Sequence, residues 1–175
     1  MSVDQKALAT LIAKDEIREL AMLYSRGVDR KDIELLKTLY TQDGTDNHGK
    51  HFNGKADDYL KFLEKSFPHM PMSAHNICHH LISVDGDQGE GEVYAIAYHL
   101  LPDGKGGMLE DYMIVRYIDR YRKENGRWLF ASRVVAFDHR GTRPIPTPEA
   151  LVPTGAADPS YKALASRLFA RGPRA

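Results

Sequence analysis

The segment "SAHNICHHLISVDGD", residues 73–87, places His75, His79, His80 and the single cysteine, Cys78, within six positions. Histidine and cysteine bind transition metals, and histidine is also a common general base. Structural zinc sites usually join two closely spaced ligands to a second such pair, which this chain lacks. On a regular strand, His75 and His79 would face one side and Cys78 and His80 the other. We therefore expect no metal site, and the ordinary alternative is that these histidines lie on the surface of a sheet.

An acidic partner for a histidine is present in "LYSRGVDRKDIELL", residues 23–36. Asp29 follows Tyr24 by five positions, near the end of a helical pattern. Aspartate often caps the helix that follows it, because its carboxylate accepts hydrogen bonds from free N–H groups. Asp32 suits that role better, since it directly precedes the apolar run that begins at Ile33. Asp29 is left either as a second cap or as a carboxylate that can orient a histidine.

A buried cation is the third chemical candidate, in "NGRWLFASRVVAFD", residues 125–138. On a regular strand Trp128 and Phe130 share one face, and Arg133 lies on the other. An arginine in such an apolar run is costly to bury without an anionic partner. The alternative is a surface arginine whose stem lies along apolar neighbours while its head stays in water.

Helical patterns fill the first part of the chain. Apolar residues recur at three- and four-residue spacings over residues 4–26, which predicts an amphipathic helix with Gly27 as an interruption near its end. A second helix is expected from Asp32 to Tyr40, with Asp32 as its N-cap. A short strand is expected near residues 45–52, and a third helix ends at Pro68.

The pattern then changes to strands. Residues 74–84, 89–101, 108–123 and 127–138 are rich in Val, Ile, Tyr and Phe and are separated by the turn signals "DGDQG", "PDGKGG" and "ENG". Short turns between long strands indicate antiparallel neighbours. Helices followed by such a meander predict an α+β domain with helices over one face of a sheet.

The chain divides into one domain over residues 1–140 and a proline-rich extension over residues 141–175. In the extension, "SYKALASRLFA" predicts a short amphipathic helix with Tyr161, Leu164 and Leu168 on one stripe. The structural alternative is a frayed tail.

Composition narrows the function classes. The 175 residues carry 24 Lys+Arg and 24 Asp+Glu, and this balance without a basic patch argues against nucleic acid as a partner. A single cysteine excludes an internal disulfide framework. The charged N-terminal sequence is unlike a signal peptide, and no apolar stretch is long enough for a membrane span. We expect a cytoplasmic protein that acts without a membrane partner.

Four motifs in order now point to a family. Tyr24-x4-Asp29, "DIELLKTLYTQDG", "SAHNICHHLISVDGD" and "YIDRY…NGRWLFASR" together resemble the SnoaL-like branch of the nuclear transport factor 2-like superfamily over residues 8–138. The resemblance implies a cone, in which a curled mixed sheet and helices close a deep apolar pocket. Within this branch the chain is similar to lyases such as scytalone dehydratase, bile-acid 7-alpha-dehydratase and hexachlorocyclohexane dehydrochlorinase.

The resemblance implies a site made of Asp29, His75, Tyr24 and Arg133. Asp29 would hold the Nδ1–H of His75 and leave Nε2 as a base, and it would stabilise the imidazolium formed by proton abstraction. Tyr24 would donate a hydrogen bond to a carbonyl or a leaving hydroxyl. Arg133, five positions after Trp128, would stabilise negative charge on an enolate or leaving group. No cofactor is implied.

The function expected from this resemblance is a cofactor-independent lyase. It would act on a hydrophobic cyclic small molecule by dehydration or by loss of another β-leaving group. One alternative is an isomerase that returns the proton elsewhere with the same base. Another is a non-catalytic ligand-binding or assembly module of the same fold, which would have no need of an oriented base.

The resemblance also implies a homotrimer in which sheet faces meet and C-terminal segments help to cover the pocket. Apolar residues expected on the outer sheet face are Tyr94, Ile96, Tyr98, Met113 and Val115. A face this apolar needs a partner surface. The run from Pro144 to Pro153 can lie extended along a neighbouring subunit.

Overall fold

A computed structural model describes residues 4–174, and it has the α+β architecture expected from the sequence. The helices are α1 (Gln5–Asp29), α2 (Ile33–Leu36), α3 (Ala56–Ser66) and α4 (Ser160–Ala163), with 3-10 turns η1 (Phe67–His69), η2 (Gly155–Ala157) and η3 (Arg167–Phe169). The strands are β1 (Tyr40–Asn47), β2 (Asn53–Lys55), β3 (Met72–Asp85), β4 (Gln88–Pro102), β5 (Met108–Glu124) and β6 (Arg127–Ile145).

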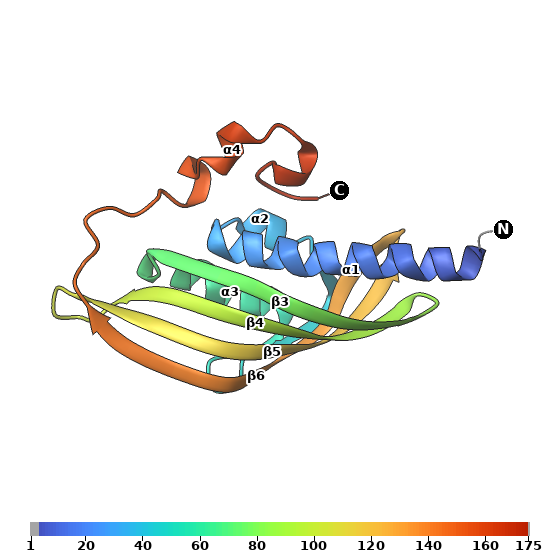
Figure 1. The fold of residues 1–175 in the computed structure, drawn as a ribbon, viewed down its shortest axis with the longest axis horizontal. Coiled ribbons are helices and arrows are strands. Elements are labelled where there is room, and N and C mark those ends of the chain that lie inside the picture. Colours follow the sequence, from blue (N-terminus) through green and yellow to red (C-terminus); the bar gives the residue numbers. More distant parts are fainter. Residues whose placement is uncertain (1–3, 175) are drawn as a thin grey trace.

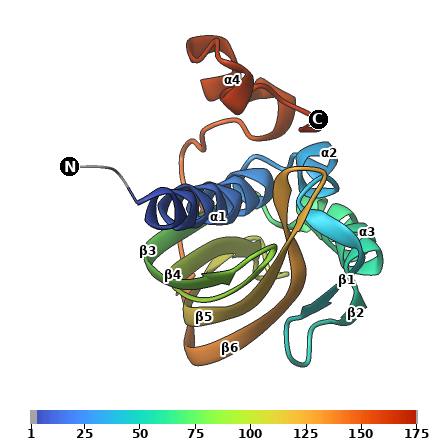
Figure 2. The same ribbon diagram turned by 90° about the vertical axis from the view of Figure 1, so that its right-hand side faces the viewer.

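The six strands form one mixed sheet in the order β2-β1-β6-β5-β4-β3. Only the β1–β6 pair is parallel among the strands described, and β3 to β6 form the expected antiparallel meander. Figure 1 shows α1 lying along one face of the sheet, and Figure 2 shows α3 beside β1 and β2. The sheet bends beneath the helices without the strong curl that the family resemblance implies.

The first helix continues through Gly27 to Asp29, beyond the end expected from the sequence. A Cβ at Gly27 would lie 2.6 Å from Cδ2 of Leu36, so the missing side chain lets α2 pack directly against α1. Asp32 caps α2 as predicted, because its side chain accepts a hydrogen bond from the Leu35 N–H at 3.2 Å. The expectation of a helix reaching Tyr40 is wrong, since α2 is one turn long and Tyr40 begins β1.

This close approach gives a prediction for Gly27→Ala. Alanine in place of glycine favours a helix by about 1 kcal/mol. The new methyl group, however, must displace the fully buried Leu36, and such overpacking costs about 1–3 kcal/mol. We expect a net loss in the free energy of unfolding, measured by urea denaturation. In a Leu36→Ala background the same change should become neutral or stabilising, and an equal loss in both backgrounds would contradict this account.

A bulge at Cys78 changes the faces of the histidines. The pairing with β4 goes from Ile77–Ala95 directly to His79–Tyr94, so Cys78 has no partner in the register. His79 consequently stacks on Tyr94, with ring centroids 4.3 Å apart. The alternation predicted for a regular strand is therefore wrong, because the extra residue puts His80 on the inner face together with His75.

A second bulge does the same for Arg133. In the pairing with β5, Ser132 faces Arg120 and Phe130 faces Tyr121, which leaves Ala131 without a partner. Arg133 thus shares the buried face with Phe130, not the opposite face predicted from regular alternation. It is fully buried, so the surface alternative is also wrong.

The core lies between the helices and the inner sheet face in two clusters. One joins α1, α2 and α3 to Tyr121, Trp128 and Phe130. The other lies on β4 to β6 and includes Met113 and Val115, which are 5 % and 2 % exposed. The expectation that these two residues lie on the outer face is wrong, because the structure places them inside.

The C-terminal extension begins later than expected and folds onto its own chain. Strand β6 continues to Ile145, past the expected boundary at residue 140. The predicted single helix is wrong, since α4 ends at Ala163 and Leu164 is exposed. Tyr161 still faces the body of the protein, where its ring lies 5.1 Å from the guanidinium carbon of Arg26.

Hydrogen bonds attach this extension to the ends of α1 and α2. Arg26 donates to Ser160 Oγ and to the carbonyl oxygen of Phe169, both at 3.0 Å. The N–H of Gly172 donates to the buried Asp32 at 2.9 Å. The extension therefore covers the outer side of the helices (Figure 1).

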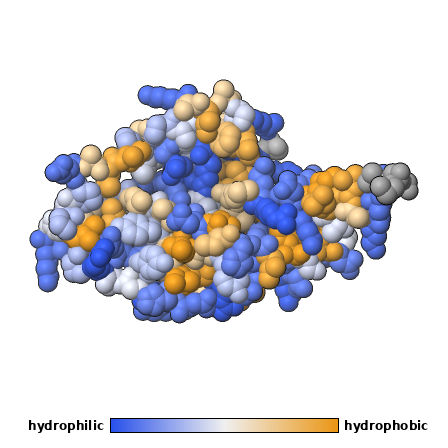
Figure 3. All heavy atoms as spheres, in the orientation of Figure 1, coloured by the Kyte–Doolittle hydropathy of each residue, from blue (hydrophilic) through white to orange (hydrophobic). Residues whose placement is uncertain are grey.

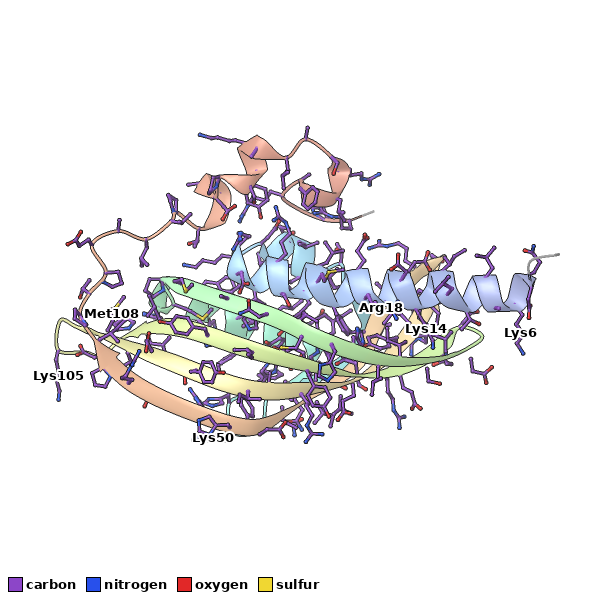
Figure 4. All side chains as sticks on the ribbon, in the orientation of Figure 1. Lys6, Lys14, Arg18, Lys50, Lys105 and Met108 are labelled. Carbon is purple, nitrogen blue, oxygen red and sulfur yellow. The ribbon has the colours of Figure 1, made fainter. Side chains whose placement is uncertain are left out.

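Helix α1 is the longest helix described, and its surface is mixed. Charged side chains project along it, including Lys6, Lys14 and Arg18 (Figure 4). Leu11 and Ile12 are 60 % and 50 % exposed. Figure 3 shows an apolar patch near the N-terminal end of the chain. Within residues 4–174, no helix combines the length and the apolar character needed to cross a bilayer.

Candidate active site

A cavity of about 290 Å³ lies between the helices and the inner face of the sheet. Its apolar lining includes Val28, Leu63, Met70, Met113, Val115 and Phe137. The polar groups that reach it come from different elements: Tyr24, His48, His51, Tyr59, His75, His99, Asp111 and Arg140. Such a pocket, with an apolar body and a few convergent polar groups, is typical of small-molecule sites.

His75 and Asp29 meet at this cavity. Asp29 is the last residue of α1, and His75 lies near the start of β3, which packs against α1. The Nδ1 of His75 lies 2.7 Å from Asp29 Oδ1, and the backbone N–H of His75 donates to Oδ2 at 2.9 Å. Both oxygens of one carboxylate therefore hold one histidine, with Nε2 left as the nitrogen that can act as a base.

The electrostatics of Asp29 keep it ionised. Burial alone would raise the pKa of its carboxyl, but the hydrogen bonds and charge of His75 outweigh burial and lower the pKa below its usual value. An ionised Asp29 favours the tautomer with hydrogen on Nδ1 and stabilises the imidazolium that forms when Nε2 takes a proton. Asp29 and His75 are 46 positions apart in the sequence, and the fold brings them into hydrogen-bond contact at the cavity.

Tyr24 also lines the cavity, and its hydroxyl is 2.7 Å from that of Tyr59 on α3. Burial and the nearby Asp46 raise the pKa of the Tyr24 phenol, while Arg133 opposes them. Tyr24 therefore remains protonated at neutral pH and can donate a hydrogen bond.

Arg133 does not reach the cavity. Its guanidinium donates two hydrogen bonds of 2.8 Å to Asp119, and both side chains are fully buried. The guanidinium carbon lies 4.2 Å from the ring centroids of Tyr24 and Tyr117, and 4.3 Å from that of Phe130. Arg133 is absent from the cavity lining found within residues 4–174, so the direct contact with substrate charge expected from the resemblance is not present. The guanidinium of Arg133 instead packs against the ring of Tyr24.

The sequence interpretation misses a second histidine–carboxylate pair. His48 Nδ1 is hydrogen-bonded to Asp46, and His48 Nε2 lies 3.1 Å from the Tyr59 hydroxyl. The signal that could have found it is the spacing Asp46-Asn-His48, because residues two apart on a strand share a face. That signal is weak here, since the surrounding sequence is mainly typical of a loop.

It also misses His99 and Asp111, which are cross-strand neighbours of β4 and β5. His99 Nδ1 lies 3.8 Å from Asp111, whose carboxylate accepts two hydrogen bonds of 2.8 Å from Arg140. Burial lowers the pKa of His99, whereas His99 and Arg140 bring the pKa of the buried Asp111 to about 2 against the effect of burial. Only the register of the two strands reveals this pair.

The comparison with known folds supports the architecture described above. A candidate scytalone dehydratase from Novosphingobium aromaticivorans is 20 % identical with a TM-score of 0.68, and the match covers 75 % of this chain and 87 % of that one. LinA-type3 hexachlorocyclohexane dehydrochlorinase from Novosphingobium barchaimii is 16 % identical with a TM-score of 0.67, covering 82 % and 97 %.

A third solved structure is a protein of unknown function. This is a variant of Rv3472 from Mycobacterium tuberculosis, which is 22 % identical with a TM-score of 0.59 and covers 73 % of each chain. At these identities the likeness establishes the fold alone. No curated protein sequence matches the chain.

The family itself follows from the sequence. The profile of the SnoaL-like domain matches residues 9–134, which include most of α1, β1 to β5 and most of the cavity lining. The match therefore covers well over half of the chain, and this protein belongs to the SnoaL-like domain family of the nuclear transport factor 2-like superfamily.

Proposed function

We propose that this protein is a cofactor-independent lyase that eliminates water, or another β-leaving group, from a hydrophobic cyclic molecule held in a cone-shaped apolar pocket. The observation that carries the proposal is the Asp29–His75 pair at the wall of the cavity. A ligand-binding module has no need of a histidine fixed by both oxygens of a carboxylate. The names of two structural neighbours, a dehydratase and a dehydrochlorinase, are in keeping with this chemistry.

The proposed step is a proton abstraction coupled to loss of a leaving group. His75 Nε2 takes a proton from the carbon beside a carbonyl, and the C–H electrons form a carbon–carbon double bond. The bond to the β-oxygen breaks, and the oxygen leaves as water once it has received a proton. Asp29 stabilises the imidazolium, and Tyr24 donates a hydrogen bond to the carbonyl or the leaving oxygen.

The cavity limits the substrate to a compact molecule. Its volume of about 290 Å³ is near the lower end for small-molecule pockets, which suits one or two fused rings. A bicyclic β-hydroxy ketone, 3-hydroxy-1-tetralone, has the required proton and leaving group. Its dehydration product rearranges to 1-naphthol, which is fluorescent.

This compound provides the test of the proposed function. The protein should accelerate formation of 1-naphthol above the spontaneous rate, with saturation kinetics. A proton of 3-hydroxy-1-tetralone that exchanges with solvent deuterium, without loss of water, would instead favour the isomerase alternative. Binding seen as chemical-shift changes of the His75 ring, without exchange or elimination, would contradict the lyase and favour the binding module.

We also propose that the protein is a homotrimer joined through its outer sheet face. Apolar side chains there are Tyr112, Ile114, Ile118 and Val134, each at least 39 % exposed. Ile118 and Val134 are cross-strand neighbours, so they form one continuous apolar area. The described part of the extension lies on the helices of its own chain and contributes nothing to the lining of its own cavity.

The assembly is tested by light scattering. We expect a trimer mass at micromolar concentration, and we expect the combined change Ile118→Glu and Val134→Glu to give a monomer, because two charges would be buried without partners. Leu11→Glu, on the exposed side of α1, is the matched control and should leave the mass unchanged. A monomeric wild-type protein would contradict the proposed trimer.

A further inference from the structure

A hydrogen-bonded chain of four side chains connects a buried carboxylate to the cavity. Asp46 is fully buried and is bonded to His48 Nδ1, and His48 Nε2 lies 3.1 Å from the Tyr59 hydroxyl. The rings of His48 and Tyr59 are stacked, with centroids 4.6 Å apart. The Tyr59 hydroxyl is 2.7 Å from that of Tyr24. This chain comes from β1, α3 and α1, and it is separate from the Asp29–His75 pair.

The direction in which the hydrogen bonds are donated along these four side chains depends on the charge of His48. When the ring is neutral and Nδ1 donates to Asp46, Nε2 can only accept, so Tyr59 donates to His48 and Tyr24 donates to Tyr59. When the ring is an imidazolium, Nε2 donates to Tyr59, Tyr59 donates to Tyr24, and the Tyr24 O–H is free to donate into the cavity. The protonated form therefore offers a donor to a ligand that the neutral form does not.

We propose that the Asp46–His48 pair is the acid of the reaction, supplying a proton through Tyr59 and Tyr24 to the leaving oxygen of the substrate. This inference rests on the lyase function proposed above. Tyr24 touches the substrate and is a catalytic residue in this scheme, whereas His48 acts through the two tyrosines. The site thus has a base from α1 and β3, and an acid from β1 and the residue that follows it, which acts through α3 and α1.

The proton balance of the step is complete. His75 Nε2 gains the proton from carbon while the leaving hydroxide takes one from Tyr24, which is refilled through Tyr59 from His48 Nε2–H. His75 ends as imidazolium and His48 ends neutral. Loss of a proton from His75 to solvent and uptake of one by His48, whose side chain is 19 % exposed, restore the starting state.

The surroundings of His48 suit a relay. Asp46 also accepts a hydrogen bond of 2.8 Å from the Tyr40 hydroxyl, so its buried charge has two donors. Burial raises the pKa values of both Tyr59 and Tyr24, which keeps the hydroxyls protonated between transfers. The other titratable and charged groups nearby are His51 and Lys50 in the same loop, and Arg140 and Asp111 from β6 and β5.

Leaving groups of different basicity test the proposal. Hydroxide needs a proton to leave, whereas chloride does not. His48→Gln should therefore lower kcat roughly ten- to a hundredfold on 3-hydroxy-1-tetralone, at or below the lower end for general acid catalysis, and change kcat little on 3-chloro-1-tetralone. Tyr59→Phe should behave in the same way. Equal losses on both compounds, or none on either, would overturn the relay.

The pH profile separates a relay from a packing role. A proton supplied through His48 predicts a wild-type kcat on the hydroxy ketone that falls at high pH, and this high-pH decline should disappear in His48→Gln. Lys50→Ala is the matched control, because Lys50 projects from the same loop (Figure 4) and should keep the decline. A decline that persists in His48→Gln would overturn the proposal.

A ligand without a leaving group can test whether Tyr24 donates a hydrogen bond into the cavity, even if the protein turns over neither the hydroxy nor the chloro ketone. The carbonyl stretch of bound 2-tetralone, whose oxygen is attached to the ring position that carries the leaving oxygen in the substrate, should shift to lower frequency when Tyr24 donates to it, and His48→Gln should reduce that shift. An identical shift in wild type and His48→Gln would overturn the relay. Failure of the proposed lyase would look different, since elimination would then be insensitive to His75→Ala.

Discussion

We expect His75→Ala to lower turnover of 3-hydroxy-1-tetralone by about 10²–10⁴-fold, the range that a general base typically contributes. The loss is expected in kcat, because the imidazole acts on the proton only as the transition state forms. It should be the same for 3-chloro-1-tetralone, since both compounds lose the same proton. Steady-state rates of naphthol formation measure both.

Asp29→Asn is expected to cause a loss of the same order by a different route. The amide keeps the size of the side chain but cannot stabilise the imidazolium, and it can present an N–H to His75 Nδ1 and so favour the wrong tautomer. Both variants should keep the circular dichroism of the wild type. Near wild-type turnover in both would exclude the Asp29–His75 mechanism.

The pairing of Asp29 with His75 can be predicted from the sequence, because α1 and the strands of the meander have clear sequence patterns. The apolar repeat predicts α1, although it ends the helix before Asp29, and the long Val- and Ile-rich runs with short turns predict the order of the meander. Asp29 is then left either as a second cap or as a carboxylate that can orient a histidine. The resemblance supplies the partner, His75.

The faces of β3 and β6 cannot be anticipated in the same way. A single bulged residue, Cys78 in one strand and Ala131 in the other, reverses the inward and outward positions that follow it. A bulge depends on how two strands pair, and the local sequence of one strand does not reveal it. This is why regular alternation assigns His80 and Arg133 to the wrong faces.

The Asp46–His48 pair escapes sequence reasoning for a related cause. The segment around it has the glycines and polar residues of a loop, and β1 gains its place by parallel pairing with β6, which is distant in sequence. The stacking of His48 on Tyr59 further depends on how α3 packs beside that strand. Tertiary contacts, not local pattern, bring His48 to the cavity.

The second large effect is expected from Arg133→Met, and it concerns stability. Arg133 and Asp119 form a fully buried, doubly hydrogen-bonded ion pair. Removing one partner leaves the other charge buried and unpaired in the core, which lowers the free energy of unfolding by about 3–5 kcal/mol. Total stabilities of domains are about 5–15 kcal/mol, so the variant should unfold at much lower urea concentration than the wild type.

Two further variants show whether the loss of stability comes from an unpaired buried charge or from lost side-chain packing. Arg133→Met combined with Asp119→Leu should recover most of the loss, because apolar pairs can replace buried ion pairs at little cost, and the Tyr121 hydroxyl keeps His80 as a partner. Arg143→Met is the surface control, since that arginine is 74 % exposed and solvent screens its pairing with Glu110. If Arg133→Met and Arg143→Met shift the urea midpoint equally, the buried pair does not stabilise the fold as argued. If the double variant is as unstable as Arg133→Met alone, the loss comes from the packing of the guanidinium against Tyr24, Tyr117 and Phe130 and not from the charge of Asp119.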